Sequence, residues 1–167
     1  MSNAYLNAYM LVTGGSRGIG AALCHHFSAL GMTVIATGRS KRSLLDMRSK
    51  ARKPENIVVC AENCATDEGR HQIAEFMHEQ CAGKLQYLIH NAGVLGTVDS
   101  AEKIKLNEFR ESMAVNAEAP FFLTQALLKE MVPGARVLHV STGAAHGGFH
   151  GWSLYCITKA AMLMVYK

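Results

Sequence analysis

Five short apolar runs, separated by segments of helical periodicity, constrain the fold of this chain more than any other feature. The runs cover residues 8–15, 32–39, 56–63, 85–93 and 136–143, and each ends in small or polar residues. Runs that are apolar at consecutive positions are typical of strands buried on both faces, as in a parallel sheet. The sequence therefore predicts five parallel strands.

The segments between these runs carry apolar residues three or four positions apart, as expected for helices with one buried face. These positions are Ile19, Leu23, Phe27, Leu30, Leu44, Leu45, Met47, Ile73, Phe76, Met77, Phe109, Met113 and Val115, followed by a helical stretch at 120–132. Right-handed crossovers between parallel strands place the helices on both faces of the sheet. We therefore expect a doubly wound, three-layer α/β/α domain, with residues 94–106 forming a loop at the strand ends.

Length and composition favour one compact domain over residues 1–167. Of the 167 residues, 49% are hydrophobic and 18% are charged, which is enough to form a core without a segment biased toward disorder. The net charge is +4, and its largest basic cluster, residues 39–53, is interpreted as a loop and helix face. We therefore expect no nucleic-acid partner. No apolar run approaches membrane-spanning length, so no membrane partner is expected either.

The cysteines and histidines give no sign of a disulfide framework or a metal site. The five cysteines are odd in number, no pair has C-x-x-C spacing, and no signal peptide precedes them. This pattern predicts reduced thiols in a cytoplasmic protein. His146 and His150 are four residues apart, but they lie in a glycine-rich loop without an accompanying cysteine or acid. We therefore expect no metal.

The stretch "VTGGSRGIG", residues 12–20, follows the first predicted strand and opens the first predicted helix. In such a turn, Gly14, Gly18 and Gly20 allow positive φ, close backbone approach and close helix–strand packing. The free amides and dipole of the helix N-terminus then favour an anion such as a pyrophosphate. A turn with a purely structural role is the alternative interpretation.

Two arginines indicate whether the expected dinucleotide is NAD(H) or NADP(H). In NAD-selective folds, a carboxylate at the end of the second strand binds the ribose hydroxyls. Here that strand ends in "ATGRS", with Arg39 and no acid, and Arg17 lies in the glycine turn. Because guanidinium groups pair bidentately with phosphate, this pair predicts a 2′-phosphate and therefore NADP(H) in preference to NAD(H). Two solvated arginines are the alternative.

Four motifs, in this order and spacing, resemble the short-chain dehydrogenase/reductase family. They are T-G-x-x-x-G-x-G at 13–20, "HNAG" at 90–93, "AVNAEAP" at 114–120, and Y-x-x-x-K at 155–159 after a strand that ends in Ser/Thr. The resemblance extends from Val12 to Lys167. Within the family, "GWSLYCITKAA" is most similar to carbonyl reductases related to benzil and sepiapterin reductases.

Tyr155 and Lys159 are four residues apart in a predicted helix and therefore share one face. A cation beside a tyrosine, together with an oxidised nicotinamide ring, lowers the pKa of the phenol. A surface pair without a catalytic role is the alternative. The resemblance implies that Tyr155 is the general acid that protonates a carbonyl oxygen during hydride transfer, with Lys159 as its electrostatic partner.

The resemblance also implies roles for residues upstream of Tyr155. Asn116 corresponds to the asparagine that holds a water for proton relay toward Lys159; the alternative is an interior asparagine bonded to the backbone. Family spacing places the carbonyl-orienting hydroxyl at Thr142, where most members have serine. Ser141 is the alternative, and on a strand the two cannot point the same way.

The resemblance further implies a set of cofactor contacts. In the N-A-G element, small residues lie against the adenine ribose and Asn91 braces the sheet, while His90 before it is expected to be a core histidine with one hydrogen bond. Asn63 takes the place of an aspartate that contacts the adenine amine, and Cys64 suits that role poorly. The expected cofactor-binding residues are Gly14, Ser16, Arg17, Gly18, Ile19, Gly20, Arg39, Asn63, Asn91, Ala92, Gly93, Tyr155 and Lys159.

Together these features predict an NADPH-dependent oxidoreductase that reduces a small-molecule carbonyl, whether ketone, aldehyde or diketone, to an alcohol. The alternative is a non-catalytic nucleotide-binding module or an inactive fragment of a longer reductase. The chain stops at Lys167, inside the helix that begins near Tyr155, so we expect a domain truncated after its fifth strand. The resemblance implies a homodimer or homotetramer, formed through helices around 121–132 and from 155 onward.

Overall fold

The computed structural model describes residues 7–166 of the chain and contains one five-stranded sheet. Its strands are β1 (Tyr9–Thr13), β2 (Thr33–Thr37), β3 (Ile57–Cys60), β4 (Leu85–His90) and β5 (Met131–His139). They are ordered β3-β2-β1-β4-β5, and every neighbouring pair is parallel. The order reverses between β1 and β4, which is where a doubly wound sheet forms its ligand crevice. The prediction of five parallel strands is confirmed.

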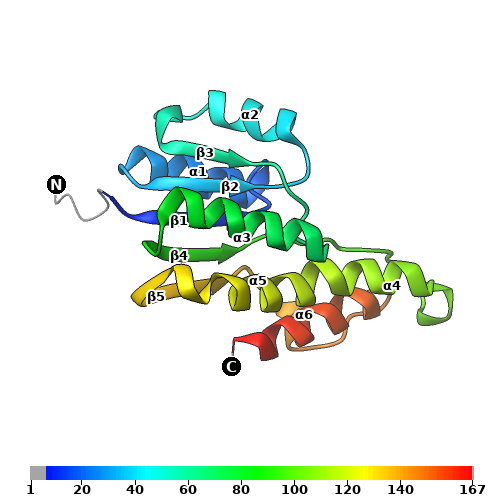
Figure 1. Cartoon of the computed structure of the whole chain (residues 1–167). Helices are drawn as coiled ribbons and strands as arrows, with labels where there is room; N and C mark the ends of the chain where they lie inside the picture. The colour runs from blue at the N-terminus through cyan, green and yellow to red at the C-terminus, as the bar shows by residue number, and fades with distance from the viewer. Residues whose placement is uncertain (1–6, 167) are drawn as a thin grey trace.

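The helices lie on both sides of this sheet, as Figure 1 shows, with α3 and α5 on one side and α1 on the other. The α-helices are α1 (Gly18–Ala29), α2 (Lys41–Ser49), α3 (Asp67–Cys81), α4 (Leu106–Met113), α5 (Ala119–Leu127) and α6 (Ser153–Val165). A π-helical turn, Ala114–Glu118, joins α4 to α5. Short 3₁₀ turns occur at Pro54–Asn56, Ala101–Lys103, Leu128–Glu130 and Gly143–Ala145.

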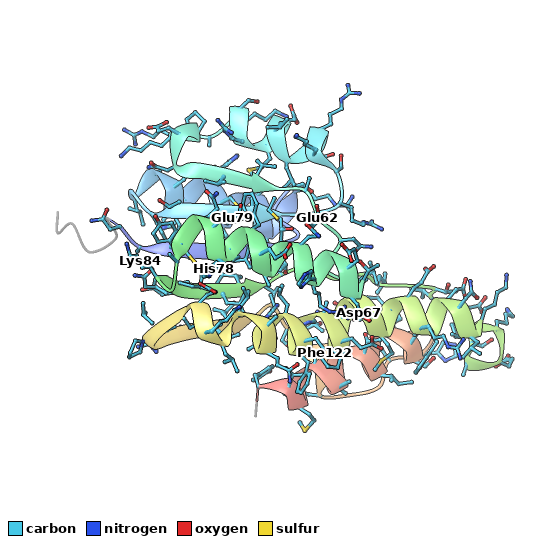
Figure 2. The ribbon with its side chains drawn as sticks, viewed as in Figure 1. Glu62, Asp67, His78, Glu79, Lys84 and Phe122 are labelled. Atoms are coloured by element: carbon cyan, nitrogen blue, oxygen red, sulfur yellow. The ribbon has the colours of Figure 1, made fainter. Side chains whose placement is uncertain are left out.

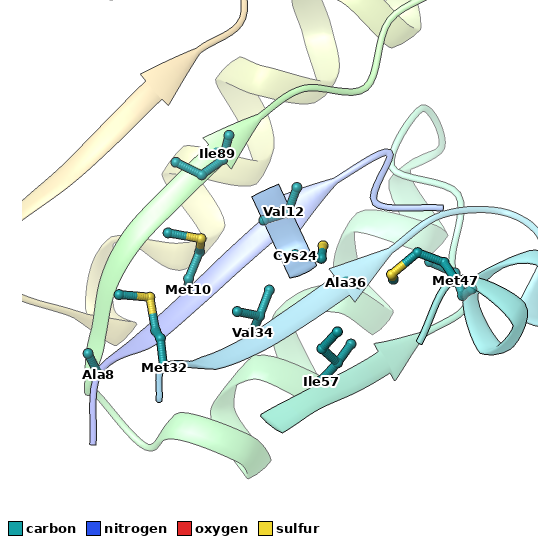
Figure 3. Close-up of a cluster of buried hydrophobic side chains, with 11 residues drawn as sticks. Ala8, Met10, Val12, Cys24, Met32, Val34, Ala36, Met47, Ile57 and Ile89 are labelled. Carbon is teal, nitrogen blue, oxygen red and sulfur yellow. The ribbon is translucent and has the colours of Figure 1, made fainter. Parts of the chain in front are cut away.

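Alternate residues of β1 to β4 enter two separate cores, which explains why these runs are apolar at consecutive positions. The fifth run is not buried on both faces as expected, because β5 lies at the sheet edge and Val137 and Leu138 are exposed. On one face, Met10 and Val12 pack with Cys24 of α1 and with Met47 of α2 (Figure 3). On the opposite face, residues such as Leu11 pack against α3 and α5. That second core contains Leu11, Ile35, Cys60, Ile73, Met77, Cys81, Leu85, Leu88, Leu123 and Leu127.

The first helix packs differently from its apolar spacing. Although Ile19 and Leu30 follow the helical period, both are exposed, and the fully buried positions of α1 are Gly20, Cys24 and Ser28. Small residues on this face let the helix approach the sheet closely. The apolar spacing therefore predicted the helix correctly, but the residues of α1 that are fully buried against the sheet are its small ones.

The fifth strand begins earlier than the sequence indicated. The helical stretch expected over 120–132 ends at Leu127, and β5 starts at Met131. Proline at 133 cannot continue a helix. The buried carboxylate of Glu130 also fixes the chain here, because it accepts hydrogen bonds from Gly83 N–H and from His78 Nδ1, both at 2.9 Å. β5 forms one edge of the described sheet.

Candidate active site

The turn between β1 and α1 requires its glycines for two different reasons. Gly14 has φ +66°, and a Cβ there would lie 2.9 Å from Ala92 Cα, so both its conformation and its surroundings exclude a side chain. A Cβ on Gly20 would collide with the carbonyl oxygen of Gly14. Gly18 has φ +56°, but open space lies around it. The turn thus presents bare backbone at the N-terminus of α1, where amides favour an anion.

Asn91 joins the ends of β1 and β4 beneath this turn. Its Nδ2 donates hydrogen bonds to Thr13 O at 3.0 Å and to Gly14 O at 3.1 Å. The Thr13 hydroxyl accepts in return from Asn91 N and Ala92 N, each at 3.1 Å. This arrangement is the bracing contact that the sequence motif implied.

A cavity of about 820 Å³ lies at the carboxyl edge of the sheet. The expected cofactor-contact residues that line it are Gly14, Ser16, Arg17, Gly18, Arg39, Asn63, Asn91, Ala92 and Gly93. Ile19 and Gly20 follow in the first turn of α1, with Ile19 exposed and Gly20 buried. Tyr155 and Lys159 are not among the lining residues. Gly93 links the two regions, because a Cβ on it would lie 3.6 Å from Lys159 Nζ.

Arg17 and Arg39 line the same cavity from two different elements. Arg17 immediately precedes α1, and Arg39 follows the end of β2; both are exposed. Thr37 and Gly38 lie on the wall beside Arg39. Arg39 is therefore a cation at the end of β2, and Arg17 lines the same cavity from the glycine turn before α1, as the sequence predicted.

Glu62, labelled in Figure 2, lines the cavity and was missed by the sequence interpretation. It comes two residues after β3, so its position at a strand end was a usable signal. Its neighbour Asn63 already accepts a hydrogen bond through Oδ1 from Ala65 N at 3.2 Å. The free donors of Asn63 Nδ2 and the Glu62 carboxylate therefore supply different chemistry to a base bound here. Cys64 also lines the wall, and burial raises the pKa of its thiol.

Arg70 holds this wall from α3. Its guanidinium is buried, and Nη1 donates to Cys64 O at 3.1 Å while Nη2 pairs with Asp67. The guanidinium carbon also lies 5.6 Å from the centroid of the Phe122 ring on α5. Figure 2 labels Asp67 and Phe122, one on α3 and the other on α5. The sequence analysis did not predict this network, because its contact with Phe122 joins α3 to α5.

Asn116 lies in the π-helical turn between α4 and α5 and is fully buried. Its Oδ1 accepts from Val94 N at 2.9 Å, and its Nδ2 donates to Val94 O at 2.8 Å and to Thr158 Oγ1 at 2.9 Å. Both hydrogens of the Asn116 side-chain amide are therefore donated to partners within the protein. The side chain ties the loop after β4 to α6, which is the structural role that the sequence left as the alternative. π-Helical turns are frequent at functional sites.

Tyr155 and Lys159 lie together on α6, as their spacing predicted. Lys159 Nζ is 5.8 Å from the centroid of the Tyr155 ring and donates to Val140 O at 3.1 Å. Burial lowers the pKa of Lys159. The pKa of Tyr155 is raised, first by burial and then by the charge that Cys156 acquires on deprotonation. Desolvation of the phenol therefore dominates in the chain by itself, and the lowering expected from Lys159 together with an oxidised nicotinamide stays a prediction.

The hydroxyl of Thr142 caps the 3₁₀ turn Gly143–Ala145 by accepting from Ala144 N at 3.4 Å. Because the oxygen accepts in this contact, its own proton stays free to be donated. Ser141 is exposed. Strand β5 ends at His139, so strict alternation does not apply to either residue. The geometry favours Thr142 as a donor held in a fixed position.

His90 is buried at the end of β4, and its Nε2 lies 2.8 Å from Thr124 Oγ1. Since the Thr124 hydroxyl donates to Pro120 O at 2.7 Å, it must accept from Nε2–H, which fixes the tautomer. Burial, and then the charge of His139 4.8 Å away, lower the pKa of His90 to about 3. The prediction of a core histidine with one hydrogen bond is confirmed.

All five cysteines lie within the described residues and are unpaired. Over residues 7–166, no cluster of three or more His, Cys, Asp or Glu side chains has the arrangement of a metal site. In the same part of the chain, every helix is too short or too polar to cross a bilayer.

A family model described as short chain dehydrogenase matches residues 8–167 of this chain. Among curated proteins, the short-chain dehydrogenase/reductase FrzI of Cladobotryum sp is 31% identical over 160 residues, which cover 94% of this chain and 61% of FrzI. The (S)-benzoin-forming benzil reductase of Bacillus cereus is 27% identical, covering 93% of this chain and 65% of the reductase. The chain thus spans less than two thirds of the length of these relatives.

Solved structures share the same architecture. A putative short-chain dehydrogenase from Shigella flexneri 2a, solved in complex with NADP, superposes with a TM-score of 0.84 at 26% identity. The match covers 96% of this chain and 70% of the other. The doubly wound fold expected from the sequence is confirmed by the sheet order and by this similarity.

Proposed function

This chain belongs to the short-chain dehydrogenase family, and on that premise we propose that it is an NADPH-dependent oxidoreductase that reduces a small-molecule carbonyl to an alcohol. One observation carries the proposal. Gly93 lies on the wall of the large cavity, and a Cβ there would be 3.6 Å from Lys159 Nζ. A cavity of dinucleotide size therefore ends beside a buried ammonium and its neighbouring phenol.

The residues of the cavity fit a dinucleotide. The Gly14 turn is a cradle that a Cβ would fill, and bare amides at the start of α1 suit a pyrophosphate. We assign the pyrophosphate to Gly14, Ser16, Gly18, Ile19 and Gly20. The adenosine lies against Asn63, Asn91, Ala92 and Gly93, with Glu62 as the acceptor for the adenine amine, and the nicotinamide ribose lies against Tyr155 and Lys159.

We assign the phosphate-bearing ribose to Arg17 and Arg39. Both residues line the cavity, Arg39 after the end of β2 and Arg17 just before α1, and neither guanidinium is paired with a carboxylate in any contact of the described residues. Guanidinium groups bind phosphate bidentately, whereas the hydroxyls of NAD favour a carboxylate at this point. The related Shigella flexneri structure in complex with NADP supports this assignment.

When bound, the reduced nicotinamide supplies a hydride to the carbonyl carbon. Tyr155 then donates its proton to the carbonyl oxygen, and its raised pKa keeps the phenol protonated at neutral pH, as a proton donor requires. Thr142 donates a hydrogen bond that orients the same oxygen. Lys159, fixed by Val140 O, places positive charge beside the phenolate that forms. Asn116 positions the loop at Val94 above this group.

We further propose that the protein works in the cytoplasm, where its five unpaired cysteines remain reduced.

We also propose a homodimer or homotetramer. Phe121 and Leu128 near α5, and Ile157 and Met164 on α6, are exposed apolar side chains that an interface between copies would bury.

The test is the oxidation of NADPH in the presence of a panel of aldehydes, ketones and diketones. The native chain should deplete the absorbance of the reduced cofactor. Tyr155→Phe should lower this rate by a factor of about 100 or more, the contribution typical of a general acid, while NADPH binding stays within about twofold. Binding of NADPH without turnover of any carbonyl would instead favour a non-catalytic nucleotide-binding module.

A further inference from the structure

We propose that the substrate carries an aryl group next to its carbonyl, and that Phe149 and Trp152 bind this ring. The inference rests on the proposed reaction at Tyr155 and names its substrate class. It starts from a cluster of two aromatic side chains, Phe149 and Trp152, that are not among the expected cofactor contacts. Trp152 lies edge-to-face with Tyr155, with ring centroids 5.8 Å apart, and Phe149 lies 6.4 Å from Trp152.

A tight turn holds the two rings in this arrangement. Trp152 N donates to Phe149 O at 3.0 Å, and Gly151 between them has φ +74°. A bond from residue i+3 to residue i with positive φ at i+2 is the geometry of a type II turn, for which glycine is required. Cys156 N then donates to Trp152 O at 2.9 Å, so the turn continues directly into α6 and Tyr155. The rings are therefore fixed relative to the reacting phenol.

The surface around the cluster is apolar and open. Phe149 is 55% exposed and Trp152 is 37% exposed, so each presents ring surface to a ligand. The loop after β4 lies against the same turn, because a Cβ on Gly151 would be 3.7 Å from Val98 Cγ1. Val98 and Leu95 in that loop are also exposed.

The two loops beside the rings offer a charged ligand little lysine or arginine, although His146 and His150 lie in the second loop and Lys159 lies beside Tyr155. In the two loops at 94–104 and 143–153, the sequence has one lysine or arginine, Lys103. Its ammonium bonds to Asp99 Oδ1 at 3.1 Å. A carboxylate or phosphate on the substrate would therefore lack a free lysine or arginine in these loops.

The two aromatic rings give this surface a preference for aromatic ligands that a purely aliphatic surface would lack. Burial of apolar area alone would treat a phenyl and a cyclohexyl group alike. Edge-to-face and offset-stacked ring pairs add a preference beyond area, which amounts to about two- to tenfold in affinity for each pair. Two exposed rings should therefore favour the phenyl compound by about fivefold or more.

Trp152 is the only tryptophan in the chain, so its fluorescence reports binding at this site without requiring turnover. With saturating NADPH present, which cannot accept a hydride from an alcohol, the protein is titrated with 1-phenylethanol and, separately, with 1-cyclohexylethanol, a product pair matched in size. We expect tryptophan emission to change with both alcohols and the Kd for the phenyl compound to be at least fivefold lower. Equal Kd values, or no response to either alcohol, would overturn the proposal.

The variant Phe149→Leu keeps an apolar side chain but removes one ring, and should reduce the phenyl preference to about twofold or less. Phe109→Leu, at a half-buried phenylalanine on α4 that does not line the cavity, is the matched control and should keep the full preference. A preference that survives Phe149→Leu unchanged would also overturn the proposal.

The outcome is separable from that of the proposed reaction. If aliphatic carbonyls are reduced in a Tyr155-dependent manner without any phenyl preference in the titration, the reaction stands and the aryl site falls. If the phenyl alcohol binds preferentially but no carbonyl is reduced, the aryl site stands and the reaction falls.

Discussion

Tyr155 and Lys159 show how burial shifts the pKa of single residues that sequence spacing brings together. The four-residue spacing placed the two groups on one face of α6, but in the chain by itself burial raises the pKa of Tyr155. Spacing fixes which side chains meet, whereas the degree of desolvation depends on the packing of other elements around them. A protonated phenol suits reduction, and the reductive rate should fall as pH rises through the pKa of Tyr155.

Arg39 is the residue on which cofactor choice is expected to depend. Arg39→Asp replaces a phosphate-binding cation with a carboxylate suited to ribose hydroxyls. We expect the Kd for NADPH to rise by about tenfold or more, and the Kd for NADH to fall. Calorimetric titration with both cofactors measures the switch.

The control for this variant is Arg42→Asp. It makes the same charge change at an exposed residue of α2 that does not line the cavity. An equal loss of NADPH affinity in the two variants would mean that only net charge matters, and would contradict the role assigned to Arg39.

His90 should make folding stability sensitive to acid. Its pKa is lowered from 6.5 to about 3 in the folded chain. As pH falls below 6.5, His90 therefore binds a proton in the unfolded chain before it does so in the folded chain. The contribution of His90 to the unfolding free energy is therefore fully present above pH 6.5 and is lost progressively toward pH 3. Between neutral pH and about pH 5, this one residue should account for about 2 kcal/mol of lost unfolding free energy.

Urea unfolding of the native chain and of His90→Asn at both pH values isolates this contribution. The asparagine variant should lose about 2 kcal/mol less on acidification, whatever its stability at neutral pH. His26→Asn, an exposed histidine on α1, should behave like the native chain. A fall of the same size in His90→Asn and the native chain would rule out His90 as the source.

At the scale of elements, the sequence predicted those whose periodicity is local and missed those set by packing. The five strands, the glycine turn and α6 follow from residues next to one another in the chain. The π-helical turn at Asn116 does not, because it depends on bonds from this side chain to Val94 and Thr158 in other elements. For the same reason the start of β5 was predicted at residue 136 and not at Met131: this start depends on the buried contacts of Glu130 with Gly83 and His78.

Helix α3 offers a test of how elements support the cavity wall. Arg70→Met keeps the length of the side chain over Phe122 but leaves the carbonyl of Cys64 without its charged donor. We expect the unfolding free energy to fall by about 1–3 kcal/mol and the Kd for NADPH to rise several-fold, because residues 62–66 lose their support. The ion pair with Asp67 adds little, since that carboxylate is exposed.

Gln72→Met on the same helix is the matched control, because the side-chain partner of Gln72 is the exposed Glu68. It should change stability by no more than about 0.5 kcal/mol. If Arg70→Met and Gln72→Met unfold at the same urea concentration, Arg70 does not support the wall as described.

For the whole molecule, topology explains why distant motifs form one site. Parallel strands end at the same edge, so the Gly14 turn, Arg39 and Asn91 converge although 77 residues separate Gly14 from Asn91. This convergence was predictable from the sequence. The wall held by Arg70 was not, because the contact of its guanidinium with Phe122 depends on how α3 packs against α5.

The account depends most on hydride transfer from NADPH to a carbonyl carbon, with the phenol of Tyr155 as the proton donor. The most direct measurement follows deuterium from NADPH labelled at the transferable position of the nicotinamide into the product of acetophenone, read by mass spectrometry. We predict labelled 1-phenylethanol from the native chain and a yield lower by about 100-fold or more from Tyr155→Phe. Unlabelled alcohol, or label transferred equally well by the two proteins, would contradict the account.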